Sequence, residues 1–290
     1  MDKKHQKAML DLQRLMEAAN LKTEEDYLRF AREMTGKTIP RFEKEALSPA
    51  EQAQDLVYEA SETDQVLEAD RLIFQAFSLD ADCVEAFEYL AEVAVSPMIA
   101  LILYQSGFTA ARKKLGEKFF EENTGNFWGI HETRPYMRCL HGYADALTVL
   151  GHKKLALDIY FNMLDLNPND NQGVRDFAGL YCLELNMMDA FEALAEQYAD
   201  DVTAFFQYNL VLFSFLKEGD SEKTRELFAE ARKRNKHVPL LLISKKNLPP
   251  LADGYTLGDK TEAVYYCTFA REIWKSKLGT ISWLEKMYRK

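Results

Sequence analysis

His131 and Glu132 are the pair whose residue types and spacing come nearest to a known catalytic motif. A zinc protease places two histidines one helical turn apart, in the pattern His-Glu-x-x-His, so that both imidazoles bind the metal. The second histidine would fall at position 135, where this chain has Pro135. We therefore interpret the pair as polar residues of an irregular segment, and we predict neither a metal site nor a cofactor.

Other catalytic motifs are also missing from the sequence. It contains no glycine-rich phosphate-binding loop and no Gly-x-Ser-x-Gly turn of the kind that presents a nucleophilic serine. The oxygen-rich run 167–173 lacks the ligand spacing and the closing glutamate of a calcium loop. We interpret this run as a turn in which Asp170 or Asn171 caps the next helix. The sequence thus predicts a protein that is not an enzyme.

Charge and composition restrict the partners that the chain can have. It has 46 acidic and 36 basic residues, a formal charge of -10, which disfavours nucleic acid as a partner. Charges interrupt the apolar residues of the first 20 positions, unlike a signal peptide, and no run approaches the roughly 20 apolar residues of a membrane span. The four cysteines are scattered without a Cys-x-x-Cys pair, which is typical of buried thiols in a reducing compartment. We predict a cytoplasmic protein that binds neither nucleic acid nor membrane.

One segment, Met137–Asp170, has the spacing of a helical hairpin. Small residues, Ala144 and Ala156, allow two helices to approach closely, Gly151 permits a tight turn, and Pro168 ends the second helix. Large apolar residues surround the small ones at helical spacing, and the whole order matches the tetratricopeptide repeat. Weaker copies of the same pattern flank this segment. We predict an all-α fold, a right-handed superhelical stack of tetratricopeptide-like antiparallel helical hairpins.

The repeat pattern also suggests how the chain is divided. Residues 1–46 are predicted to form an N-terminal helical extension, and the sequence Ser-Pro-Ala-Glu at 48–51 is a strong helix start. The repeat array is predicted over 47–236, with an irregular insertion at 116–136 where the period breaks. Residues 237–290 are predicted to form a C-terminal helical cap of the stack.

Three segments carry a resemblance to a known family. They are Asn126–Gly129 (Asn-Phe-Trp-Gly), Glu132–Arg138 (Glu-Thr-Arg-Pro-Tyr-Met-Arg) and Leu166–Arg175, which begins Leu-Asn-Pro-Asn-Asp. With them the chain resembles the suppressor-of-tumorigenicity-seven family and its bacterial tetratricopeptide relatives, over roughly residues 50–288. The resemblance implies a helical-repeat fold and an interaction role, and it provides no catalytic residues.

In tetratricopeptide arrays the first helix of each hairpin lines a concave groove that binds an extended peptide or a partner helix. The corresponding positions here are mixed cations, amides and an aromatic residue: Arg138, His141, Asp145, Gln172, Arg175, Asn209 and Phe213. The junction between the insertion and the best repeat is a second candidate site, with Trp128, Glu132 and Arg134.

We therefore predict a non-catalytic protein-protein interaction or scaffold module whose partner is a protein or peptide. The identity of the partner and the oligomeric state of the chain are left open. Two alternatives also stay open: a peptide-responsive regulatory protein, and an enzyme with an unrecognised site near residues 128–138.

Overall fold

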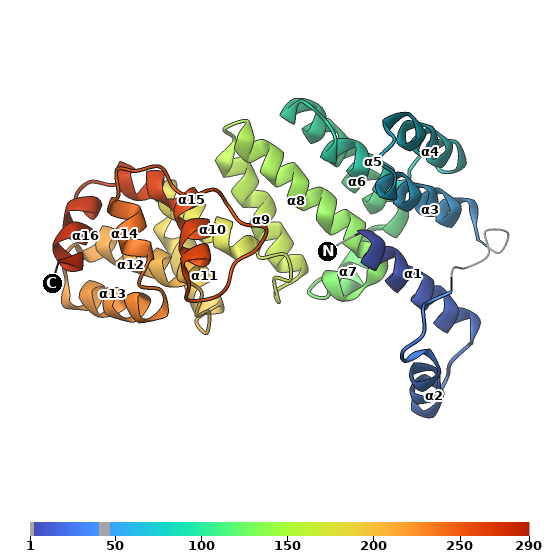
Figure 1. Ribbon diagram of the computed structural model, residues 1–290, viewed down its shortest axis with the longest axis horizontal. Helices are drawn as coiled ribbons and strands as arrows, with labels where there is room; N and C mark the ends of the chain where they lie inside the picture. Colours follow the sequence, from blue (N-terminus) through green and yellow to red (C-terminus); the bar gives the residue numbers. More distant parts are fainter. Residues whose placement is uncertain (1–2, 41–46, 290) are drawn as a thin grey trace. The chain divides into compact units, whose positions relative to one another are not determined.

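The computed structural model describes residues 3–40 and 47–289, and this part of the chain is entirely helical (Figure 1). It contains sixteen α-helices and short 3-10 turns, and no β-strand occurs within these residues. None of the helices described is long and apolar enough to cross a membrane. The predicted all-α class is confirmed.

The described chain forms two compact units. Unit 1 consists of Met1–His152 with Asp165–Asn171, and unit 2 of Lys153–Leu164 with Gln172–Lys290. The division passes through the segment 137–170, which had the clearest repeat pattern. It does not coincide with the predicted boundaries at 46/47 and 236/237. The first of these adjoins residues 41–46, which lie outside the described residues.

Unit 1 begins with helices whose starts are encoded locally. Helix α2 (Glu24–Met34) starts at Thr23, and α3 (Pro49–Glu62) starts at Ser48; each cap exchanges hydrogen bonds with the acidic residue three positions later. The other helices are α1 (Lys3–Ala18), α4 (Val66–Leu79), α5 (Val84–Glu92), α6 (Pro97–Leu115), α7 (Glu117–Asn123) and α8 (Arg134–Val149). Consecutive helices α3 and α4, and likewise α5 and α6, pack directly against each other, and α8 packs on α6.

Small residues bring α6 and α8 close together. Gly107 of α6 lies against α8, and an added Cβ there would be 2.7 Å from Cys139 Sγ and 3.2 Å from Phe87 Cβ. Since Phe87 Cβ is fixed to its backbone, the contact cannot relax by a side-chain rotation alone. The sequence therefore uses glycine here for close helix packing, although glycine lowers intrinsic helix propensity.

Gly107→Val is expected to destabilise unit 1 by about 1–3 kcal/mol, because the added methyl groups overpack the contact between α6 and α8. The measurement is thermal unfolding followed by circular dichroism. Gln105→Val, at an exposed position of the same helix, controls for the helix propensity of valine. Equal unfolding temperatures for the two variants would contradict the packing argument.

The predicted insertion, 116–136, is built from short helical pieces around an aromatic cluster. Helix α7 is followed by the 3-10 turns η2 (Phe127–Gly129) and η3 (His131–Thr133), and α8 begins at Arg134. The Phe127 ring packs against Phe120 and Tyr136, with ring centroids 4.9 and 6.0 Å away. The buried hydroxyl of Thr133 donates to the carbonyls of Phe127 and Ile130. These contacts fix the segment that leads into α8.

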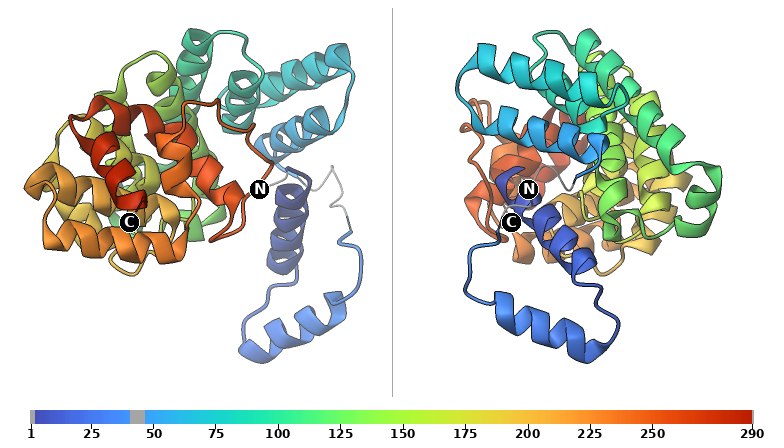
Figure 2. Two further views of the ribbon diagram at one scale, coloured as in Figure 1. Left: turned by 60° about the vertical axis from the view of Figure 1, so that its left-hand side comes forward. Right: turned by 90° about the vertical axis from the view of Figure 1, so that its right-hand side faces the viewer.

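Unit 2 contains the remaining helices, which lie side by side in yellow, orange and red in Figures 1 and 2. They are α9 (Lys153–Leu166, whose last two residues belong to unit 1), α10 (Val174–Glu184), α11 (Met188–Gln197), α12 (Ala204–Glu218), α13 (Glu222–Arg234), α14 (Val238–Ile243), α15 (Lys260–Ser276) and α16 (Thr280–Tyr288). Trp274 is fully buried, and its Nε1 donates to the Tyr266 hydroxyl at 2.8 Å. Two other buried residues, Asn235 and Glu262, hydrogen-bond to each other at 2.9 Å.

Candidate functional site

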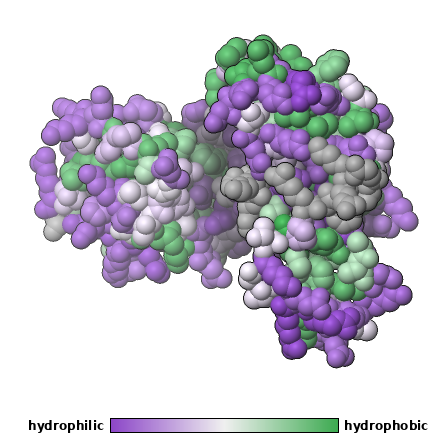
Figure 3. Space-filling model, turned by 45° about the vertical axis from the view of Figure 1, so that its right-hand side comes forward, coloured by the Kyte–Doolittle hydropathy of each residue, from purple (hydrophilic) through white to green (hydrophobic). Residues whose placement is uncertain are grey.

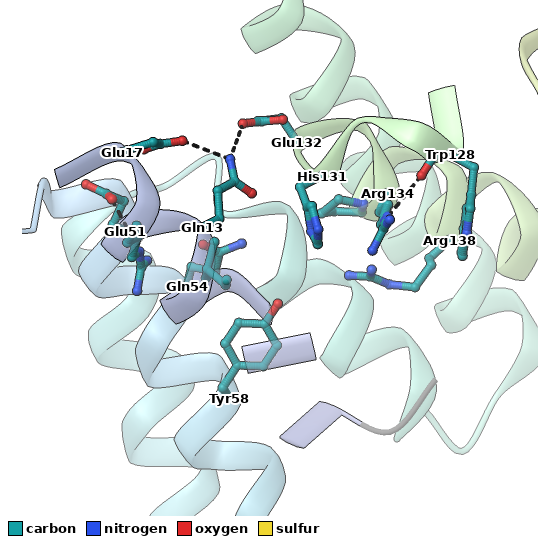
Figure 4. Close-up of a pocket in the computed structure, with 13 residues that line it drawn as sticks. Gln13, Glu17, Glu51, Gln54, Tyr58, Trp128, His131, Glu132, Arg134 and Arg138 are labelled. Atoms are coloured by element: carbon teal, nitrogen blue, oxygen red, sulfur yellow. Dashed lines mark hydrogen bonds and ion pairs between the residues drawn. The ribbon is translucent and has the colours of Figure 1, made fainter. Parts of the chain in front are cut away.

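Unit 1 contains a polar cavity of about 200 Å³ (Figure 4). Its lining comes from α1, α3, the 3-10 segment and the beginning of α8. The lining residues are Leu10, Gln13, Arg14, Glu17, Glu51, Gln54, Tyr58, Trp128, His131, Glu132, Arg134, Pro135 and Arg138.

Arg138 forms the most complete ion pair of the cavity wall. Its Nε and Nη2 donate to the two carboxylate oxygens of the buried Glu88, at 2.7 and 2.8 Å. Burial opposes the charged form of Arg138, but the Glu88 carboxylate outweighs it and raises the pKa of the guanidinium. The planar fork of this arginine is therefore fully used within the protein.

Arg14 is buried in a charged cluster between α1 and α3, and only 4% of its surface is exposed. Its Nη1 donates to Asp55 at 2.9 Å and lies 3.4 Å from Asp11. Lys7 reaches the other oxygen of Asp55 at 3.0 Å. The remaining edge of the guanidinium, Nε and Nη2, has no hydrogen-bond partner among the described residues. A buried edge without hydrogen bonds is costly unless another group supplies acceptors, and Glu51 approaches it only as an ion pair.

Glu51 does not complete the Arg14 fork. Its Oε1 lies 3.4 Å from Arg14 Nε, while its Oε2 accepts from the Ser48 backbone and hydroxyl at 2.8 and 2.6 Å. The Ser48 hydroxyl is also the main cause of the lowered pKa of Glu51. Since the capping box holds this carboxylate at the start of α3, Glu51 remains charged and at the edge of the cavity.

Gln13 lies between two carboxylates at the rim, as Figure 4 shows. Its Nε2 donates to Glu17 at 3.0 Å and to Glu132 at 3.1 Å. Its Oε1 is buried and accepts no hydrogen bond from the part of the chain that the structure describes. Two carboxylates and the amide's own oxygen, all hydrogen-bond acceptors, thus lie close together.

Arg134 and Trp128 form the opposite wall. Arg134 Nε donates to the Trp128 carbonyl at 3.0 Å, and the guanidinium carbon lies 5.6 Å from the centroid of the Trp128 ring. Within the described ranges Arg134 forms no ion pair with a carboxylate. Burial, and then the charge of Arg134, lower the pKa of His131, so this imidazole is neutral at pH 7. This wall presents a guanidinium and a neutral imidazole.

The lowered pKa of His131 predicts a dependence of stability on pH. The unfolded chain binds a proton at this residue below its ordinary pKa of 6.5, while the folded chain resists protonation. The stabilisation is therefore present above pH 6.5 and is lost as the pH falls from that value through the lowered folded-state pKa. His131→Gln is expected to lose less thermal stability than the natural chain between pH 7.5 and pH 5. The same substitution at the exposed His152 is the control, and equal losses in the two variants would contradict this assignment.

The residues predicted from sequence are distributed over several places. Trp128, Glu132 and Arg134, the predicted junction, line the cavity together with Arg138. His141 and Asp145 face each other along α8, with 3.8 Å between Nε2 and Oδ2. Whether any of these side chains binds a partner stays a prediction.

The remaining predicted groove residues belong to unit 2. Gln172 precedes α10, and Arg175 pairs with Asp201 at 2.7 Å. Asn209 and Phe213 are core residues, 2% and 8% exposed. Asn209 accepts from the Tyr266 hydroxyl at 3.2 Å, and Phe213 packs on Phe191. These two side chains do not offer the accessible surface that a groove residue needs.

The contribution of α1 to the cavity was missed by sequence reasoning. Lys7, Asp11 and Arg14 recur at intervals of four and three residues, so they share one face of α1. A charged stripe at this spacing, beside the apolar stripe of the same helix, was a usable signal for a buried polar contact. The spacing does not indicate which helix this charged stripe faces.

A second hollow, between α1 and α2, is apolar. It is lined mainly by Leu12 and Met16 of α1 and by Tyr27, Phe30 and Met34 of α2. Figure 3 shows the green apolar surface in this part of unit 1. Tyr27 is 47% exposed, and α2 has no buried residue.

No family model, no curated protein and no solved structure matches this chain. All four cysteines are buried and free of disulfides, as predicted, and burial is the main cause that raises the pKa of each thiol. Over the described ranges no three His, Cys, Asp or Glu side chains converge closely enough to hold a metal ion.

Proposed function

We propose that this chain is a non-catalytic interaction module that binds a peptide or a segment of a partner protein in the cavity of unit 1. The observation that carries the proposal is a set of polar groups at one cavity that lack partners among the described residues: the edge of Arg14 without a hydrogen bond, the Oε1 of Gln13 without a donor and the Arg134 guanidinium without an ion pair. Peptide backbones and side chains supply acceptors and donors of this kind.

The packing of the helices in pairs supports the proposal that the chain is a stack of helical hairpins. Consecutive helices that pack in pairs, α3 with α4 and α5 with α6, are what a stack of tetratricopeptide-like hairpins requires. The right-handed superhelix and the relation to the suppressor-of-tumorigenicity-seven family are part of this proposal. A cytoplasmic location is also proposed, because four buried free thiols suit a reducing compartment.

Affinity selection from a library of free synthetic peptides, identified by mass spectrometry, tests the function. The immobilised chain is expected to enrich peptides whose binding is lost in Arg134→Ala, since this guanidinium lines the cavity. Arg71→Ala is the matched control, because Arg71 is an exposed arginine of α4 that pairs with Glu68. If no peptide is enriched, or if enriched peptides bind the Arg134 and Arg71 variants equally, the proposal fails.

A further inference from the structure

The two arginine forks of the cavity wall, those of Arg14 and Arg138, differ in one respect. Arg138 and Arg14 both lie against acidic residues, but Glu88 fills the Nε/Nη2 edge of Arg138, and the same edge of Arg14 has no hydrogen-bond partner among the described residues. This edge matches a carboxylate, which can accept two parallel hydrogen bonds from it. Glu51 reaches this edge only as an ion pair, with Oε1 3.4 Å from Arg14 Nε, because its other oxygen is held by the capping box. A carboxylate from outside the chain would fill the edge of Arg14 as Glu88 fills that of Arg138.

The rim of the cavity needs a positively charged group, whereas the edge of Arg14 needs a negatively charged one. Glu17 and Glu132 accept from the same nitrogen of Gln13, so two negative groups lie close together. Across the described part of the chain, neither forms an ion pair with a cation. The buried Oε1 of Gln13 is a third acceptor beside them. A positively charged donor would relieve the repulsion between the carboxylates and satisfy this oxygen.

The balance of charge restricts the ligand further. Three arginines and three glutamates line the cavity, and the charges behind the wall include Asp55 and Glu88 as well as Lys7. A purely anionic ligand would approach Arg14 against Asp55 and Glu51, and a purely cationic one would approach the rim in the presence of the arginines. A ligand that carries both charges adds no net charge to the cavity and places an opposite charge at each end.

We propose that the cavity binds a small zwitterion, with its carboxylate on the Nε/Nη2 edge of Arg14 and its ammonium group between Glu17, Glu132 and Gln13 Oε1. The ligand class is a free α-amino acid or a short peptide with both ends free, and the volume of about 200 Å³ is below that of a drug-sized pocket. This inference rests on the proposed binding function and specifies the ligand of the same cavity.

Ligand-observed saturation-transfer NMR with the full chain tests the inference. The probes are alanyl-alanine, its N-acetylated form, its C-terminal amide and free alanine. Each capped dipeptide is expected to bind at least about tenfold more weakly than alanyl-alanine, because it lacks one charge-assisted contact. Alanine and alanyl-alanine together distinguish a free amino acid from a short peptide. Equal binding of capped and uncapped forms, or no binding of any probe, would overturn the inference.

Two variants assign the ends of the ligand. Arg14→Lys keeps the charge but removes the fork, so the amide is expected to bind as well as alanyl-alanine. Because Arg14 is buried and this variant can lose stability, Glu132→Gln at the exposed rim is the second test. Glu132→Gln is expected to bind alanyl-alanine and its N-acetylated form equally well. Glu121→Gln, at an exposed position, is the control and is expected to keep the preference for alanyl-alanine. If Glu132→Gln still prefers alanyl-alanine over its N-acetylated form, the placement of the ammonium group beside Glu132 is wrong.

The two levels of the proposal can fail separately. If library peptides require Arg134 but no small zwitterion binds, the interaction function stands and the ligand class is wrong. If no library peptide binds the cavity but alanyl-alanine binds with the expected preferences, the cavity is a small-molecule site and binding of a longer peptide or protein segment is wrong.

Discussion

Glu88→Leu is expected to destabilise unit 1 by about 3–5 kcal/mol, because it removes both hydrogen-bond acceptors of the Arg138 fork and leaves the more weakly interacting Glu85 as its acidic neighbour. Glu88 is 4% exposed and supplies both acceptors of Arg138. Hydrogen exchange read by mass spectrometry measures the effect, since it reports protection in α5 and α8 separately from unit 2. The expected result is faster exchange in both helices of unit 1.

The double variant Glu88→Leu with Arg138→Met distinguishes an orphaned charge from lost packing. Two apolar side chains of similar length need no hydrogen-bond partners, so most of the lost protection is expected to return. A double variant as unstable as Glu88→Leu alone would mean that the shape of the pair, and not its charge, stabilises the contact of α5 with α8.

Glu262→Ala is expected to have a comparable effect on unit 2, of at least about 3 kcal/mol. One oxygen of this buried carboxylate accepts from Ala204 N at 2.7 Å, and the other accepts from Gly258 N at 2.7 Å and Asn235 Nδ2 at 2.9 Å. Removing it leaves the buried Ala204 N–H without an acceptor and takes one of two acceptors from Asn235 Nδ2, and each lost bond to a buried charged group costs about 1.5–3 kcal/mol. The first turn of α12 and the loop before α15 are expected to lose protection from exchange.

The control for this variant is Glu272→Ala on the same helix. Glu272 is exposed and pairs only with the neighbouring Lys275 among the described residues, so α12 is expected to keep its natural protection. If both variants lose protection equally, the effect comes from helix α15 itself. In that case the loss of protection is not caused by the missing hydrogen bonds of Glu262.

Local signals in the sequence were sufficient for the helices and several of their ends. The capping boxes at Thr23 and Ser48 depend only on residues three positions apart, and both form. Gly151 adopts a φ of 83° in the turn between α8 and α9, as the repeat pattern indicates. The cap predicted at Asp170 or Asn171 is wrong, because α10 starts after Gly173, which is in the left-handed conformation. A polar turn precedes α10 in the predicted and in the observed start alike. Residue propensities alone could not distinguish a helix start after Asp170 or Asn171 from one after Gly173.

The candidate site was accessible from sequence only in part. Trp128, Glu132 and Arg134 are close in the chain, so their clustering could be seen directly. Gln13 and Arg14 join them from more than 110 residues away, as the separation of Gln13 and Glu132 shows. Contacts of this kind depend on how helices pack, and periodicity specifies a face of a helix without naming its neighbour. Asn209 and Phe213 show the same limit, since their spacing fitted a groove and packing buried them.

The charged cluster of α1 has a consequence for the assembly of the cavity. Lys7 and Arg14, which also pair with Asp11 of their own helix, hold α1 against Asp55 of α3, so one wall of the cavity is attached through buried ion pairs. A ligand that touches Arg14 and Glu132 at once would bridge α1 and the segment before α8. Its binding free energy would then add to the docking free energy of α1, and occupancy of the cavity and attachment of the N-terminal helix would rise and fall together.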